Sequence, residues 1–434
     1  MFGKMKAITI LALLAIVAGC AVQKDKNKRL TDYVNPFIGT TTLWDSIDLG
    51  YNPTRRAWGA ETFPGASLPN SMVQVTPVTM WRSGSGYQYE DTIIHAFVHT
   101  SKGHWNLCYV PLIAVSGNVE PKSYYTGYSH DNESASPGYY QVYLKKYDIN
   151  AEVTSSLRCG YHKYTYKNGK EKKLLVDLSH SNEHIRSWNI EKAGDNVFSG
   201  YQQTGPTFYF YAVTNHKIKD IESLKDGDTE VRIVNFINNE NINDPLEMKV
   251  GFSYVSVENA KKNLEAEILK KDFEQVRNEA SDTWEGLLSK IQVSGGTEIQ
   301  KETFYSALYK AFLWPILLSD VNGEYVDAKG EVVNKGFRYY SEPSFWDDYR
   351  NKLILLGMVS PDVTADVIKS ITDYGEIRGF MPRFFHGDHA SVFVTGSYLR
   401  GIHDFDVQKA YKILLNNAFA EGKGSRPHIK EYME

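Results

Sequence analysis

The chain has 434 residues, of which 42% are hydrophobic and 23% are charged, and this globular composition predicts about two or three domains. Its formal net charge is −4 at pH 7 with acidic and basic residues interspersed, which excludes the basic face of a nucleic-acid-binding protein. Aromatic residues are abundant, with 29 Tyr, 20 Phe and 8 Trp. This abundance is typical of a large β-rich core, and aromatic faces would also suit stacking on sugar rings.

Residues 1–19 have the pattern of a bacterial lipoprotein signal peptide. A positively charged start leads into an apolar core that is too short to span a membrane with these flanks. Residues 17–20 read Val-Ala-Gly-Cys, a lipobox, so Cys20 would become the lipidated first residue of the mature chain. A plain cleaved signal peptide is the alternative. Residues 20–30 would then form the lipidated cysteine and a polar tether.

Two further cysteines remain in the mature chain. Cys108 and Cys159 both lie in apolar, strand-like stretches, where a buried free cysteine is common. We therefore expect them to be unpaired, and no cysteine spacing suggests a zinc site.

Residues 31–255 are predicted to form a β domain. Alternating apolar and polar residues, or short apolar runs, predict strands at 140–145, 161–166, 174–178, 208–211 and 250–254. The second of these strands is followed by a turn signal, Asn168-Gly169. Many short strands with frequent turn signals predict a β-sandwich.

Residues 256–296 are predicted to form one or two linker helices. Apolar residues recur there mostly at four-residue steps, at Leu264, Ile268, Val276, Ala280, Trp284 and Leu288. This spacing places them on one helical face.

Residues 297–434 are predicted to be helical. The expected helices cover about 298–318, 346–358, 361–376, 390–402 and 406–420. Pro361 after Ser360 suits the first position of a helix after its cap, and Asp404 or Asp406 could cap the last helix.

Four motifs connect these segments to a known family. The sequence reads YVNPFIGT at 33–40, TFPGASLP followed by MVQVTP at 62–77, SDVNGEY at 319–325 and SFWDDYR at 344–350. In this order they resemble glycoside hydrolase family 92. The resemblance runs from about residue 33 to the last residue, and it covers the N-terminal part of a longer family member. Asn70 and Ser71 depart from the Phe-Gly that is common in the family.

The resemblance implies an N-terminal β-sandwich, linker helices and an (α/α) six-hairpin toroid. It also implies calcium-dependent removal of terminal α-mannose, most often α-1,2-linked, from mannose-containing glycans with inversion, which requires two carboxyl groups separated enough to admit water. The family's general acid and base, a Glu and an Asp, come from the later half of the toroid. They have no counterpart here, and we expect them beyond Glu434.

The predicted helices are too few to close a toroid, and the chain ends without a helix stop signal. The sequence therefore predicts only the first part of the toroid. The first hypothesis is an inverting exo-α-mannosidase, expected to be α-1,2-specific, that lacks its acid/base half. The alternative is a catalytically inactive, lipid-anchored carbohydrate-binding fragment. A polysaccharide lyase is disfavoured, because lyases commonly place the toroid before the sandwich.

Trp346, Asp347 and Arg350 are the strongest candidate substrate contacts. Trp can stack on a sugar face, Asp can accept sugar hydroxyls, and Arg can fix that carboxylate or donate to a hydroxyl. The resemblance implies that this motif lines the terminal-mannose pocket. The structural alternative is an Asp–Arg pair three residues apart that stabilises a helix start. Asp348 replaces a small polar residue, and no role is predicted for it.

Further candidates lie in the β domain: Gly65, Trp81, Gly86, Tyr87 and His99. The resemblance implies that the loop from Trp81 to Tyr87 reaches into the pocket, and glycines permit tight turns near a ligand. Ordinary turn glycines, a core Trp and a structural His are the alternatives.

His386, Asp388 and His389 occupy the place of a pocket loop in the family. They are predicted to contact substrate. Two His flanking an Asp could instead bind a transition metal, or the loop could be merely solvated. Ca²⁺ prefers oxygen ligands, so its ligands are expected mainly beyond Glu434, and no metal ligand is assigned here. The tether and lipid anchor predict a cell-envelope lipoprotein, on the outer membrane surface or periplasmic face of a Gram-negative bacterium.

Overall fold

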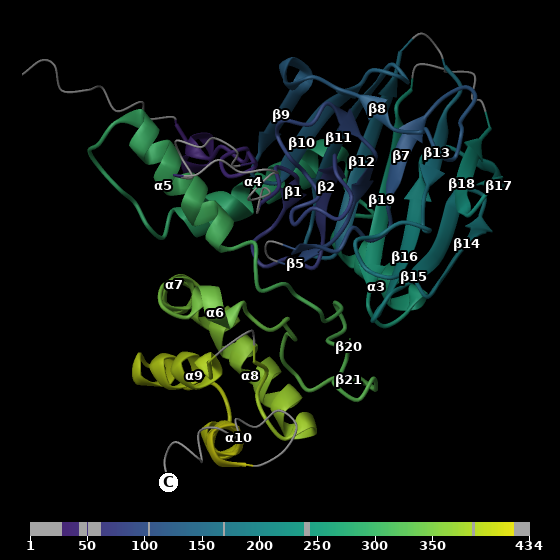
Figure 1. Ribbon diagram of the computed structural model, residues 1–434. Coiled ribbons are helices and arrows are strands. Elements are labelled where there is room, and N and C mark those ends of the chain that lie inside the picture. Colours follow the sequence, from purple (N-terminus) through teal and green to yellow (C-terminus); the bar gives the residue numbers. More distant parts are fainter. Residues whose placement is uncertain are drawn as a thin grey trace, which may run out of the picture.

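The computed structural model describes residues 28–42, 50, 62–102, 105–167, 170–237, 244–383 and 387–420. A β-rich N-terminal region is followed by a helical region (Figure 1), in the predicted order. The predicted signal peptide with Cys20, the turn at Asn168-Gly169 and His386 lie outside the described residues. Within the described ranges, no helix is long and apolar enough to cross a membrane.

Two large antiparallel sheets form the β-rich region. The first has the order β1 (Ala66–Ser67), β2 (Gln74–Val78), β4 (Ala96–Val98), β7 (Leu112–Val115), β13 (Lys173–Val176), β18 (Thr229–Phe236), β17 (Ile218–Asp226). The second has the order β14 (Ser187–Gly194), β15 (Val197–Gln203), β16 (Thr207–Thr214), β19 (Leu246–Ser253), β12 (Cys159–Tyr166), β11 (Ile149–Ser155), β10 (Tyr139–Leu144), β9 (Glu133–Ser136). All five predicted strands are confirmed, as β10, β12, β13, β16 and β19.

Smaller elements complete this region. Short paired strands join β3 (Ile93–Ile94) with β8 (Thr126–Gly127) and β5 (Ser101–Lys102) with β6 (Trp105–Asn106). Two 3-10 helices are η1 (Leu30–Tyr33) and η2 (His130–Asn132).

The two sheets share one hydrophobic core. β11 of the second sheet contacts β1, β2 and β7 of the first, and buried residues of both sheets form one cluster. β16 alternates between buried and half-buried residues along its whole length, because successive side chains of a strand point to opposite faces. Leu174, Leu175 and Val176 of β13 are all buried, as predicted for a strand covered on both faces.

Two helices follow the last strand, α3 (Val257–Glu267) and α4 (Phe273–Leu288). Ser256 caps the first by accepting a hydrogen bond from the Asn259 N–H. Asp272 and Gln275 form a capping box at the start of the second. These caps explain why one long periodic stretch gives two helices. α3 packs on β16 and β19, and α4 packs on β11.

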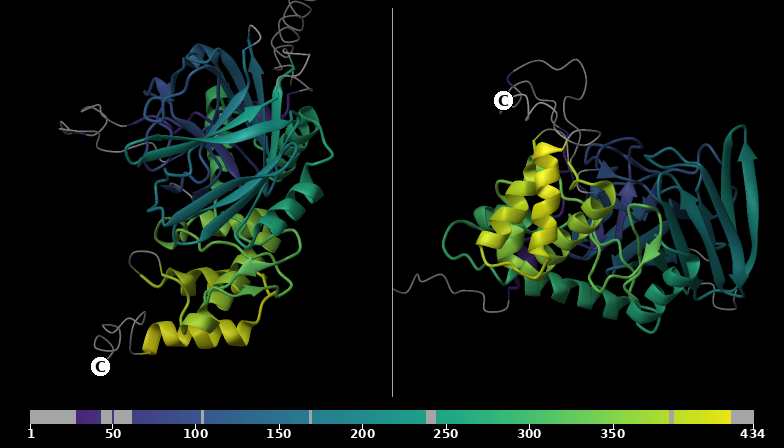
Figure 2. Two further views of the ribbon diagram at one scale, coloured as in Figure 1. Left: turned by 90° about the vertical axis from the view of Figure 1, so that its right-hand side faces the viewer. Right: turned by 90° about the horizontal axis from the view of Figure 1, so that it is seen from below.

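The helical region contains α5 (Glu298–Ala311), α6 (Phe345–Asp348), α7 (Lys352–Val359), α8 (Pro361–Arg378), α9 (His389–Leu399) and α10 (Val407–Phe419). Figure 2 shows α10 at the end of this region that lies away from the sheets. Pro361 begins α8 as predicted, although the Ser360 side chain makes no capping bond. Asp406 caps α10 by accepting from the Lys409 N–H, which decides between the two predicted caps.

Two predicted helices differ from the structure. The helix expected at 298–318 ends at Ala311, because Pro315 has no N–H and restricts the residue before it. The helix expected at 346–358 is divided into α6 and α7, and the Asn351 side chain caps the start of α7. Periodicity alone does not detect either interruption.

Cys108 and Cys159 are both free and buried, as predicted. Burial raises the pKa of each thiol, so neither is a reactive thiolate at neutral pH.

A polar junction joins the β-rich and helical regions at the predicted motif 319–325. The Asp320 carboxylate accepts hydrogen bonds from the Ser253 hydroxyl at 2.6 Å and from the side-chain amides of Asn259 at 2.9 Å and Asn263 at 2.7 Å. Burial raises the pKa of Asp320, and these hydrogen bonds oppose the shift. The motif therefore connects the end of β19 and α3 to the helical region.

Asn70 provides a second connection. Its backbone N–H donates to the Phe312 carbonyl at 2.7 Å, its side chain donates to the Pro315 carbonyl at 2.8 Å, and its own carbonyl accepts from the Leu317 N–H at 3.0 Å. The residue that departs from the family pattern thus holds the segment that follows α5.

Candidate active site

The short helix α6 presents the strongest predicted contacts to solvent. Phe345 is buried and packs against Phe393 of α9, with ring centroids 6.0 Å apart. Because Phe345 points inward, the next two residues point outward: Trp346 is 47% exposed, and Asp347 is also exposed. Arg350 is exposed too. All three predicted residues can therefore meet a ligand from solution.

Asp347 and Arg350 are held by different neighbours. The Ser344 hydroxyl donates to Asp347 Oδ2 at 2.5 Å. Arg350 Nε donates to the Tyr349 hydroxyl at 2.6 Å, and the guanidinium lies 5.1 Å from the centroid of that ring. The described contacts include no Asp347–Arg350 ion pair, so the structural alternative predicted from their spacing is not formed.

His389, at the start of α9, joins this cluster. Its ring stacks on Tyr349 with centroids 4.1 Å apart and an interplanar angle of 6°, and it lies 5.8 Å from the Trp346 ring. The neighbouring Asp388 accepts a hydrogen bond from the Asn417 side chain of α10 at 3.0 Å. α6, α9 and α10 thus bring predicted residues together from two separate stretches of the chain.

The two candidate glycines in the β-rich region have packing roles. A Cβ on Gly65 would lie 2.3 Å from the Val75 carbonyl oxygen, and one on Gly86 would lie 2.8 Å from the Asn106 amide nitrogen. Gly86 also has a φ of +76°, a left-handed conformation that favours glycine. Close packing within the region therefore requires both glycines.

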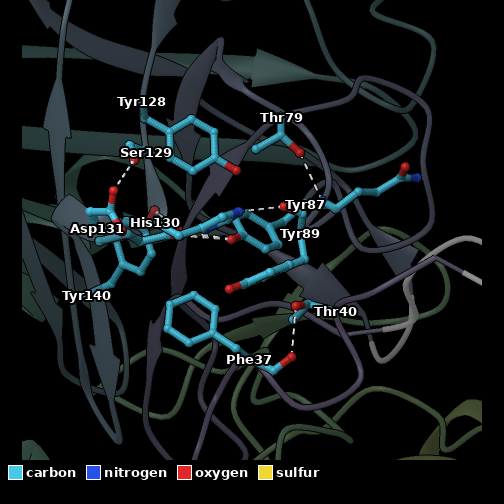
Figure 3. Close-up of polar contacts among 12 residues, drawn as sticks. Phe37, Thr40, Thr79, Tyr87, Tyr89, Tyr128, Ser129, His130, Asp131 and Tyr140 are labelled. Carbon is cyan, nitrogen blue, oxygen red and sulfur yellow. Dashed lines mark hydrogen bonds and ion pairs between the residues drawn. The ribbon is translucent and has the colours of Figure 1, made fainter.

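Tyr87 is buried in a polar cluster. Its hydroxyl lies 3.0 and 3.1 Å from the two oxygens of Glu133, which also accepts from the Tyr140 hydroxyl and from His130 Nδ1, each at 2.6 Å. Figure 3 shows Tyr87, Tyr140 and His130 gathered in this cluster. Burial and the charge of Glu133 raise the pKa of Tyr87. Tyr87 is 0% exposed, so its ring does not meet a ligand from solution here. Its predicted contact with substrate stays a prediction.

His99 is fully buried and paired with another imidazole. Its Nε2 lies 3.0 Å from His162 Nε2, and its Nδ1 lies 3.0 Å from the Val110 carbonyl oxygen. Because a carbonyl only accepts, His99 Nδ1 carries the proton and His162 donates to His99 Nε2. Burial lowers the pKa of His99 to about 3, so the ring is neutral and reaches no surface here.

Trp81 is half-buried, between two histidine rings. Its centroid lies 5.9 Å from that of His95 and 5.6 Å from that of His180. His180 Nδ1 donates to the buried Asp177 carboxylate at 2.7 Å, and this hydrogen bond raises the pKa of His180. Trp81 keeps a partly open face that a ligand could contact.

Comparison with known proteins identifies the family. Residues 33–265 match the glycosyl hydrolase family 92 N-terminal domain, and residues 259–434 match the glycosyl hydrolase family 92 catalytic domain. The chain belongs to glycosyl hydrolase family 92. A search of curated proteins finds no match.

Solved structures share the fold of this family 92 chain. The family GH92 α-mannosidase BT3965 from Bacteroides thetaiotaomicron superposes with a TM-score of 0.84 and 24% identity, over 94% of this chain and 59% of that one. Its complex with mannoimidazole gives 0.83 and 25%, over 94% and 57%. The inverting mannosidase BT2199 from Bacteroides thetaiotaomicron VPI-5482 gives 0.79 and 22%, over 91% and 56%. The chain therefore spans about three fifths of the length of these relatives.

Several residues of the family 92 site had no predicted role. Ser344 fixes Asp347, Tyr349 holds both Arg350 and His389, and Asn417 fixes Asp388. Ser344 is a polar residue at a helix start, a signal that could have been used; nothing in the sequence connects Asn417 to the site. Asp348 forms an ion pair with Lys352 at 3.0 Å.

The described part of the family 92 chain does not fit a calcium site. No group of three or more His, Cys, Asp or Glu among the described residues is arranged to hold a metal ion. Ca²⁺ takes about six to eight oxygen ligands, whereas α6 and the start of α9 offer the carboxylates of Asp347, Asp348 and Asp388, and that of Asp348 is paired with Lys352. We derive no catalytic step through calcium.

Proposed function

We propose that the chain is part of an inverting exo-α-mannosidase, acting on α-1,2-linked mannose at the ends of mannose-containing glycans. The observation that carries this proposal is the exposed group of Trp346, Asp347 and Arg350 beside His389 in a family 92 chain. A flat ring, an acceptor and a donor together match the two aspects of a pyranose, its C–H face and its hydroxyls.

Each residue has a separate part in holding the terminal sugar. Trp346 stacks on one face of the ring. Asp347 accepts sugar hydroxyls through the oxygen that Ser344 does not engage, and Arg350 donates through the guanidinium N–H groups not used by Tyr349. His389 and Asp388 close the pocket from α9, and Trp81 contacts the sugar from the β-rich region.

We also propose that the two sheets form the family's β-sandwich and that the helices after residue 297 form the first part of its toroid. The general acid and base are then supplied by polypeptide beyond Glu434. Inversion places the two carboxyl groups about 6.5–9.5 Å apart, with water between them. Calcium dependence is carried over from the family, with ligands outside the described residues.

The predicted lipid anchor belongs to the same proposal. Cys20, in the lipobox of residues 17–20, would attach the protein to the cell envelope of a Gram-negative bacterium. The substrate would then be a glycan met at the outer membrane surface or in the periplasm.

The test is mannose release from α-1,2-, α-1,3- and α-1,6-mannobiose by the purified chain, with Ca²⁺ and then with EDTA. We expect no release by the chain alone, and binding of mannobiose that Trp346→Ala weakens at least about tenfold. Release that EDTA abolishes would place the acid and base within this chain or a bound partner. Absence of both release and binding would overturn the proposal.

A further inference from the structure

A second surface with the chemistry of a sugar site lies between the β-rich and helical regions. It is a groove of about 830 Å³ between the loop at 203–207, which joins β15 to β16, and the hairpin of β20 (Tyr325–Val326) and β21 (Val332–Val333). Figure 1 shows this hairpin below the ends of β15 and β16. Small-molecule sites commonly measure about 300–1,000 Å³, so the groove is large enough for more than one sugar ring.

Three tyrosine rings line the groove. Tyr109 is fixed by a 2.5 Å hydrogen bond between its hydroxyl and that of Thr204. Tyr254 packs against Phe208 with centroids 4.8 Å apart. Tyr209 and Tyr254 are half-buried, and within the described residues their hydroxyls make no hydrogen bond. Tyr209 and Tyr254 therefore offer partly exposed ring faces and unused hydroxyls, as sugar-binding tyrosines do, whereas Tyr109 is buried and forms part of the floor of the groove.

Polar side chains add unused donors and acceptors. Gln203 accepts from the Ser187 hydroxyl through Oε1, which leaves its amide N–H groups for a ligand. Asp327 Oδ1 accepts two backbone N–H groups of its own turn, which leaves Oδ2. Glu183 Oε1 accepts from Trp105 Nε1 at 2.9 Å, which leaves Oε2. A ligand whose groups both donate and accept, as hydroxyls do, satisfies all three side chains.

The charge of the groove further restricts the chemical class of ligand that it can bind. Its described lining carries Glu183, Asp327 and Glu342 and no basic residue. Such a surface repels phosphorylated, sulfated or acidic ligands. It accepts a neutral polyhydroxyl compound, and it would also accept a basic peptide. The tyrosine rings and the unused amide of Gln203 favour the polyhydroxyl compound.

We propose that this groove is a second glycan-binding site, for a neutral oligosaccharide, apart from the terminal-sugar contacts of α6. None of Trp346, Asp347 and Arg350 lines it. Mannose as the sugar rests on the proposed function, whereas a neutral oligosaccharide follows from the lining alone. The site would hold a glycan on the enzyme while its end is processed elsewhere.

The experiment is calorimetric titration of the full chain with α-1,2-mannotriose, for the wild type and for Tyr209→Ala and Trp346→Ala. We expect Tyr209→Ala to weaken one binding event about tenfold or more, and Trp346→Ala to leave that event within about twofold. Tyr201→Ala is the matched control, because Tyr201 pairs with Tyr209 across β15 and β16 but does not line the groove. Thermal melting of each variant checks that it is folded.

Unchanged mannotriose binding by folded Tyr209→Ala would overturn the proposal. So would loss of all binding in Trp346→Ala, or Tyr209-dependent binding of oligolysine in place of mannotriose. Trp346-dependent binding of mannobiose is measured separately. Tyr209-dependent binding of mannotriose without any Trp346-dependent binding of mannobiose would sink the proposed function alone. Trp346-dependent binding of mannobiose with mannotriose binding insensitive to Tyr209 would sink the second site alone.

Discussion

The candidate residues of the β-rich region and those of the helical region differ in their exposure to solvent. In the β-rich region, Gly65, Tyr87 and His99 are packed, buried or hydrogen-bonded inside the fold. In the helical region, Trp346, Asp347 and Arg350 lie exposed beside His389. The candidate residues therefore fall into two cases: those of the β-rich region pack within the fold, and those of α6 are open to a ligand. Exposure and unused hydrogen-bonding capacity separate the two cases.

The largest expected effect is at the junction of the two regions. Asp320→Ala removes the acceptor of three side-chain donors, so the Ser253 hydroxyl and one N–H each of the Asn259 and Asn263 amides lose their partner. We expect the free energy of unfolding to fall by about 3–5 kcal/mol. Urea denaturation measures it, with Asp320→Asn as the control that keeps the volume and part of the bonding. A loss below about 1 kcal/mol would mean that the junction does not hold the regions together.

Tyr87→Phe tests whether a buried candidate acts only inside the fold. The change removes one hydrogen bond to the Glu133 carboxylate, and such bonds contribute about 1.5–3 kcal/mol. Stability should fall by that amount while affinity for mannobiose stays the same. Tyr201→Phe is the control, because that hydroxyl makes no hydrogen bond within the described residues. A tenfold loss of affinity with unchanged stability would place Tyr87 in the substrate pocket.

Lys310 forms contacts across the boundary between the two regions, and the pH dependence of stability can test them. Its ammonium group on α5 donates to the Pro36 carbonyl at 2.8 Å and to the Thr62 hydroxyl at 3.0 Å. Burial lowers the pKa of Lys310 from its ordinary value of 10.5 to about 7. Between these values the unfolded chain binds more protons than the folded one, so the free energy of unfolding rises with pH. The part that Lys310 contributes is lost as the pH falls from the ordinary pKa through the folded-state pKa of about 7.

Lys310→Met removes this titration. We expect its curve of unfolding free energy against pH, measured by urea denaturation between about pH 7 and 10, to rise less steeply than that of the wild type. Other groups titrate equally in both proteins, so the difference between the curves isolates Lys310. Parallel curves would show that Lys310 is solvated in the folded protein.

The smallest expected change in stability is at Trp346. Since the side chain is 47% exposed, Trp346→Ala should alter the free energy of unfolding by no more than about 1 kcal/mol. Affinity for mannobiose should nevertheless fall at least about tenfold. Leu399→Ala, at a side chain that is 77% exposed on α9, is the matched control with intact affinity. A large loss of stability on Trp346→Ala would assign the indole to packing.

Sequence periodicity predicted most elements because its cause is local. Alternation with a period of two gave β10 and β12, and four-residue steps gave α3 and α4. The errors occurred where one residue interrupts a pattern, as at Pro315 and Asn351. The site was predicted in part: the motif at 344–350 indicated α6, but the role of Asn417 depends on contact between α10 and the start of α9.

The sequence by itself determined the type and order of the elements, the family, and which side chains are candidates for contact with a sugar, since all of these are properties of neighbouring residues. Only the tertiary structure decided which of those side chains a ligand can reach. His99 is neutral and buried because His162, 63 positions away, completes its hydrogen bonds. The groove at Tyr209 exists because a hairpin more than a hundred residues later packs against the β-rich region. Burial and pKa depend on such distant neighbours, and no local pattern records them.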